Sequence, residues 1–145
     1  MRWMVAFWMM MAGAVSAADW SEPARGSVDR KGMIDAVRPH AEWLFGAPVQ
    51  FIVHELRQAG PIGFGVLTAQ RPGGKPIDMR MTPGAQNGDV DVEMEDQEEF
   101  QILYRKSGDT WVAVHWSNGA QDVWFAWEPL CAEYRAVISE ACQGL

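Results

Sequence analysis

Four segments with the pattern of β-strands constrain this chain most: the first two alternate apolar residues with polar residues or glycine, and the last two are rich in aromatic and β-branched residues. These segments are residues 49–58, 62–66, 100–106 and 110–116. Gly60-Pro61 turns the chain between the first two, and Ser107-Gly108-Asp109 joins the last two. The pattern therefore predicts two β-hairpins. Gly63 and Gly65 lie inside the second strand and predict a bend or a close approach of another group to its backbone.

A helix is predicted before the strands. Ser27 and Asp29 are candidate N-caps, and the apolar residues that follow recur at helical spacing as far as about Phe45. Pro39 falls inside this segment and predicts a kink or a split, since proline lacks an N–H and clashes with the preceding turn. Residues 79–99 show no clear period and are expected to form a long loop, and a final short helix is expected to start near Pro129.

The only two cysteines, Cys131 and Cys142, restrict this last helix. A continuous helix would separate their Cα atoms by about 16 Å, whereas a disulfide needs less than about 7 Å. If they pair, the helix must end and the chain fold back. A metal pair or a reactive thiol is the alternative, but there is no CxxC spacing and no histidine nearby.

The N-terminus has the pattern of a secretory signal peptide. Arg2 precedes an apolar run from Trp3 to Ala14, and small residues follow at the positions that a signal peptidase reads. Cleavage after Ala17 and cleavage after Ala18 fit equally well, and an uncleaved anchor is the rival reading, although about a dozen residues is short for a bilayer span. We expect residues 1–18 to be a signal peptide and residues 19–145 to be one α+β domain in the periplasm or outside the cell, with no membrane span after cleavage.

The net charge of the chain restricts the classes of partner that it can bind. The formal net charge is −7, and removing Arg2 with the leader makes it −8. This balance argues against nucleic acid and against an anionic membrane surface, and it favours a basic partner. Seven of the carboxylates lie within residues 89–99. Their spacing partly matches a calcium loop, but Val92 stands where that loop requires glycine, so we expect a solvated acidic loop and no metal.

Residues that could carry chemistry are few. The histidines are not paired at ligand spacing, and there is no G-x-S-x-G, S-x-x-K, H-E-x-x-H or phosphate-binding glycine loop. We therefore expect no catalytic residues and no cofactor. If the sheet curves into a cone, His115, His54 and Asp122 converge on a cavity, where an acid/base pair or a small-ligand site becomes possible.

Tryptophans are concentrated near the C-terminus, where four of them lie between Trp111 and Trp127. Core packing explains most of them, but residues 123–127 cannot all point inward if they are extended. Trp124 and Trp127 are therefore our candidate contact residues for a partner, with His115 and Asp122 as further candidates. This hypothesis describes a non-catalytic binding module of the cell envelope; the alternatives are a small-ligand or enzyme domain and a structural or stress-related envelope protein.

The order of one helix, four antiparallel strands and a short C-terminal helix resembles the cystatin-like and NTF2-like α+β class. Two motifs of the sequence resemble a family of small, uncharacterised exported bacterial proteins. They are the run Arg-Pro-Gly-Gly at 71–74 and the closing segment from Asp122 through Cys131, Tyr134-Arg135 and Cys142. This resemblance covers most of the chain after the leader and implies no activity. The sequence as a whole predicts a helix packed on a curved four-stranded antiparallel sheet, with the C-terminal helix pinned by a disulfide.

Overall fold

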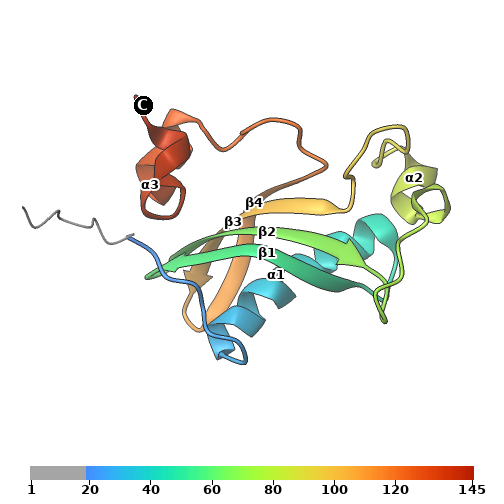
Figure 1. Cartoon of the computed structure of the whole chain (residues 1–145), viewed down its shortest axis with the longest axis horizontal. Helices are drawn as coiled ribbons and strands as arrows, with labels where there is room; N and C mark the ends of the chain where they lie inside the picture. Colours follow the sequence, from blue (N-terminus) through green and yellow to red (C-terminus); the bar gives the residue numbers. More distant parts are fainter. Residues whose placement is uncertain (1–18) are drawn as a thin grey trace, which may run out of the picture.

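A computed structural model describes residues 19–145 of the chain (Figure 1). The signal peptide predicted over residues 1–18 lies outside the described residues. The elements are α1 (Val28–Phe45), β1 (Gln50–Ala59), β2 (Ile62–Gln70), the 3-10 helix η1 (Met79–Met81), α2 (Pro83–Asn87), β3 (Glu99–Ser107), β4 (Thr110–Asn118), α3 (Glu128–Ile138) and the 3-10 helix η2 (Ser139–Cys142). The predicted α+β order is confirmed.

The four strands form one open antiparallel sheet in the order β1-β2-β3-β4. Both predicted hairpins are confirmed: Ala59 pairs with Ile62 across the first turn, and Ser107 pairs with Thr110 across the second. The register shifts once between Val53 and Glu55 on β1 and once between Leu103 and Tyr104 on β3. Before the first shift the half-buried positions are Phe51 and Val53, and after it the buried position is Leu56. A bulge reverses the phase of the alternation in this way.

α1 covers one face of the sheet and fixes the larger of two hydrophobic clusters. Ser27 is the N-cap, and its hydroxyl accepts a hydrogen bond from the backbone N–H of Arg30. The buried stripe of the helix consists of Met33, Val37, Ala41, Leu44 and Phe45. Pro39 lies inside this helix without splitting it. At the other end, the guanidinium of Arg71, from the Arg-Pro-Gly-Gly run, donates to the backbone oxygens of Phe45 and Pro48.

The two glycines of β2 allow α1 and β3 to approach the strand. A Cβ added at Gly63 would lie 2.5 Å from the terminal methyl of Met33, and one added at Gly65 would lie 3.0 Å from the ring of Tyr104. A larger residue at Gly63 would displace the end of Met33 and crowd the backbone oxygen of Arg57, 2.9 Å away, and one at Gly65 would require the ring of Tyr104 to shift slightly. The predicted close approach is confirmed.

α3 packs on the opposite face of the same sheet, as Figure 1 shows. Phe64 and Leu103 point toward it and form a second hydrophobic cluster with Tyr134, Val137 and Ile138. Cys131 and Cys142 form a disulfide with a Cα–Cα distance of 5.6 Å. The helix ends at Ile138 and η2 returns the chain, which confirms the predicted reversal. The chain thus has two helical layers with the sheet between them.

The prediction of a long loop over residues 79–99 was wrong in part, because η1 and α2 lie within it. Thr82 caps α2 by accepting a hydrogen bond from Ala85, Pro83 occupies the first turn and Gly88 ends the helix in the left-handed conformation. Threonine, proline and glycine at these positions are ordinary helix signals. With only five residues in α2, they produce no visible helical period.

None of the helices in residues 19–145 has the length and apolar character needed to cross a bilayer.

Candidate binding groove

The segment that precedes α1 is held against the edge of the sheet. The backbone N–H and C=O groups of Ser21 and Gln58 exchange two hydrogen bonds of 2.9 and 2.8 Å. The guanidinium of Arg57 lies 4.8 Å from the centre of the Trp20 ring, a cation–π distance. These contacts fix where the chain enters α1, and they place Arg25 beside the first turn of that helix.

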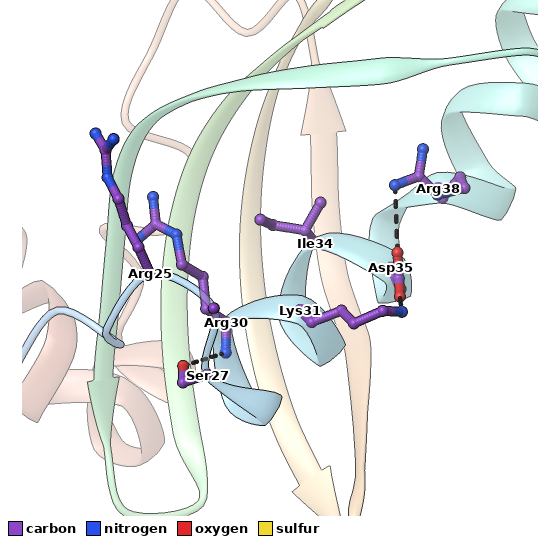
Figure 2. A pocket seen from close by; sticks show the side chains of 8 residues that line it. Arg25, Ser27, Arg30, Lys31, Ile34, Asp35 and Arg38 are labelled. Atoms are coloured by element: carbon purple, nitrogen blue, oxygen red, sulfur yellow. Dashed lines mark hydrogen bonds and ion pairs between the residues drawn. The ribbon is translucent and has the colours of Figure 1, made fainter.

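The entry segment and α1 together line a groove of about 430 Å³, shown in Figure 2. The helical residues concerned recur every three or four positions and form a stripe beside the buried one. The residues that carry its charge and its apolar surface are Arg25, Arg30, Lys31, Ile34, Asp35 and Arg38. This volume falls in the usual range for ligand pockets, which is about 300–1,000 Å³.

Four cations and one carboxylate line this groove, although the whole chain is acidic. The carboxylate is Asp35, which pairs with Lys31 and lies 3.2 Å from a guanidinium nitrogen of Arg38. The hydrogen bond from Lys31, followed by that from Arg38, lowers the pKa of Asp35, although partial burial opposes the shift. Asp35 therefore stays ionised at neutral pH and offsets part of the positive charge.

The arginines of the groove differ in how firmly they are held. Arg30 is only 13% exposed, and it donates to a carboxylate oxygen of Glu22 at 2.9 Å and to the backbone oxygen of Pro23 at 3.1 Å. Arg38 donates to the backbone oxygen of Val49, and its guanidinium lies 5.5 Å from the centre of the Phe51 ring. Within residues 19–145, the side chain of Arg25 has no hydrogen-bond or ion-pair partner, and the residue is exposed.

Chemically, this arrangement suits an anionic group. A guanidinium presents planar N–H donors that match carboxylate and phosphate oxygens. Because Arg30 and Arg38 are already oriented by protein acceptors, a ligand would not have to immobilise them, which reduces the entropic cost of binding.

The residues predicted from the sequence lie elsewhere, in β4 and in the connection from β4 to α3. Trp127 is 60% exposed and precedes α3, whereas Trp124 is half-buried and its Nε1 donates to Oε1 of Gln101 at 3.0 Å. His115 is exposed, with its ring centre 6.2 Å from that of Tyr134, and Asp122 is exposed. Trp127 thus remains available for a partner, and Trp124 is committed to packing.

The structure does not bring His54 and His115 together. They lie on β1 and β4, the two edge strands, so two further strands separate them. Three inter-strand spacings amount to about 14 Å. The ring of His54 is hydrogen-bonded to Thr68 Oγ1 at 2.7 Å, and His115 stands opposite Leu103 in a different row of the sheet. Within residues 19–145, no group of three or more His, Cys, Asp or Glu side chains is arranged to hold a metal ion.

Sequence reasoning missed the groove because it weighed net charge. The signal was local: Arg30, Lys31, Ile34 and Arg38 follow one another at helical spacing on a segment predicted to be a helix. Arg25 carries no comparable signal, since its position depends on how the entry segment pairs with β1.

Comparison with protein-family models, curated proteins and solved structures found no match for this chain.

Proposed function

We propose that this chain is an exported, non-catalytic binding module of the cell envelope, and that its groove along α1 holds an anionic group of a partner protein. Two features support export: the N-terminal signal-peptide pattern and the disulfide, a bond that persists in oxidising compartments. The observation that carries binding is the gathering of four cations in one groove of an acidic chain.

The charges that line the groove determine which group it binds, because the charges farther away on the protein are screened by salt. At physiological ionic strength the screening length is about 8 Å, so distant carboxylates are largely screened from the groove. Close cations are screened much less. The basic partner favoured by net charge is therefore replaced by an anionic group at this site.

Catalysis is less well supported by the geometry. The candidate acid/base residues His54 and His115 lie on opposite edges of the sheet. The face beneath α1, where a cone-shaped sheet would enclose a cavity, is filled by buried side chains that include Phe100, Ile102 and Tyr104. A groove lined by arginine and lysine, by contrast, can bind an anionic group without any acid/base pair.

The test measures binding of fluorescein-labelled poly-L-glutamate to the purified protein by fluorescence anisotropy, with poly-L-lysine as the control of opposite charge. In the groove variant, Arg25→Gln is combined with Lys31→Gln, two exposed cations whose loss should leave the fold intact. The variant loses two exposed ion pairs with the polyglutamate, and this loss should weaken binding about fivefold. Raised salt should weaken binding of the unaltered protein in the same direction.

The matched control combines Lys75→Gln with Arg80→Gln, two exposed cations outside the groove. Both double variants change the net charge by the same amount. An effect confined to the groove variant supports the proposal. Equal losses in the two variants would show that only net charge matters, and no binding by the unaltered protein would favour a structural role.

A further inference from the structure

The groove has two cationic ends and an apolar middle. Figure 2 shows Arg25 and Arg30 at one end, Ile34 in the middle and Arg38 at the other end. Ile34 is half-buried and packs against the larger hydrophobic cluster, so its outer surface is a fixed apolar floor. A ligand that fills this groove therefore meets positive charge, then apolar surface, then positive charge again.

Each end carries one positive charge in excess. Arg25 and Arg30 are opposed by Glu22, which binds Arg30, while Lys31 and Arg38 are opposed by Asp35, which binds both. A carboxylate, with a single negative charge, neutralises one end. A phosphate group carries a charge nearer two at neutral pH, so it overcompensates. The charges therefore favour two separate carboxylates.

The spacing of the two ends fits an extended peptide. Arg30 and Arg38 are eight residues apart on α1, which corresponds to about 12 Å along the helix axis. In an extended chain, residues i and i+4 lie about 13 Å apart and on the same side, with residue i+2 between them on that side. Acidic residues at i and i+4 would thus reach the two ends, and an apolar residue at i+2 would meet Ile34.

A helical ligand would need a different spacing. On a helix, residues that lie about 12 Å apart on one face are seven or eight positions apart. An extended segment covers that distance with residues four positions apart, so it presents all three contacts within five residues.

We propose that the groove binds an extended acidic segment of a protein partner, with carboxylates four residues apart on either side of an apolar side chain. This inference rests on the proposed function and adds the class, conformation and spacing of the ligand. Among residues 19–145, Arg25 is the cation of the groove that has no protein partner, and the carboxylate at that end of the segment supplies one.

The experiment uses fluorescein-labelled synthetic peptides that contain Glu-Ser-Leu-Ser-Glu, with fluorescence anisotropy as the readout. The controls change one feature each: Leu to Ser, each Glu to Gln, or the two Glu moved to a spacing of two residues. We expect each control peptide to bind about fivefold more weakly than the parent peptide, the loss that follows from one missing contact of about 1 kcal/mol.

The protein variant Arg25→Gln tests the site itself, with Lys75→Gln as the charge-matched control and thermal unfolding as the check on folding. We expect Arg25→Gln, which removes one exposed ion pair, to weaken binding of the parent peptide about threefold, and Lys75→Gln to change its affinity by less than about 1.5-fold. Backbone amide NMR shifts induced by the peptide should lie in residues 25–38.

The outcomes separate this inference from the proposed function. If all peptides bind with the same affinity and Arg25→Gln lowers that affinity, the groove binds anions without the proposed spacing and the inference is overturned. If inorganic phosphate displaces the peptide at equal concentration, the carboxylate preference is overturned. If Arg25→Gln and Lys75→Gln have the same effect, or the shifts lie outside residues 25–38, both proposals are overturned.

Discussion

The indole Nε1 of Trp111 on β4 donates a 2.9 Å hydrogen bond to the carboxylate of Asp29 in the first turn of α1. The same carboxylate accepts hydrogen bonds from Lys106 at 2.8 Å and from Gln58 at 3.1 Å. Asp29 thus ties the start of α1 to β1, β3 and β4. Since the groove is built on this part of α1, the carboxylate fixes the surface on which binding is proposed.

Asp29 should make the free energy of unfolding depend on pH in the acidic range. The hydrogen bonds from Lys106 and Trp111, in that order of importance, lower the pKa of Asp29 from 3.8 to about 2. A carboxyl group whose pKa is lower in the folded state stabilises it fully above the unfolded pKa of 3.8 and loses this effect as the pH falls through about 2. We expect Asp29→Asn to lower the free energy of unfolding at pH 7 by about 1–2 kcal/mol, the usual contribution of charged hydrogen bonds.

Urea unfolding at several pH values checks this expectation. The difference between Asp29→Asn and the unaltered protein should shrink as the pH falls from about 4 to about 2. The exposed Asp122, replaced by Asn, serves as the control and should show no comparable difference. A difference for Asp29→Asn that stays constant with pH would mean that the loss comes from packing and not from the charge.

Tyr104 lies fully buried beneath α1, and its hydroxyl has no hydrogen-bond partner within residues 19–145. Burial raises the pKa of this hydroxyl, so the group is protonated at neutral pH. A buried polar group without a partner costs about 1–3 kcal/mol. We expect Tyr104→Phe to raise the free energy of unfolding by about 1 kcal/mol in urea titrations. A decrease instead would reveal a buried water that bonds the hydroxyl.

The strands, both hairpins and α1 could be predicted because each depends on local pattern. Alternation over residues 49–58, the glycine turn at 107–109 and the cap at Ser27 are all visible within a few residues. The second hydrophobic cluster could not be predicted in this way. Phe64 reads as one residue of an alternating strand, and only the return of α3 determines what covers it.

The groove shows the same limit. A helical stripe of cations can be recognised in the sequence, but its neighbours cannot. Arg25 joins the stripe because Ser21 pairs with Gln58, a contact between residues far apart in the chain. His115 and His54 illustrate the reverse case. Their predicted convergence required a sheet curved into a cone, but they lie on the two opposite edge strands of the sheet.

Trp124 and Trp127 are only three residues apart, yet their substitution should have very different effects. The ring of Trp124 lies 5.5 Å from that of Phe125 in the second hydrophobic cluster, whereas Trp127 is 60% exposed. Trp124→Ala should lower the free energy of unfolding by about 2–3 kcal/mol, and Trp127→Ala by less than about 1 kcal/mol.

Thermal and urea unfolding of each single variant separate these two effects, and Trp124→Phe is the matched control because it keeps a ring while losing the N–H that binds Gln101. This control should fall between the unaltered protein and Trp124→Ala. If Trp127→Ala proves as destabilising as Trp124→Ala, its ring is covered in solution, and the concentration dependence of unfolding then shows whether a second copy covers it. If Trp127→Ala unfolds normally, it is a stable variant in which the predicted contact role of this ring can be tested with partner binding as the only readout.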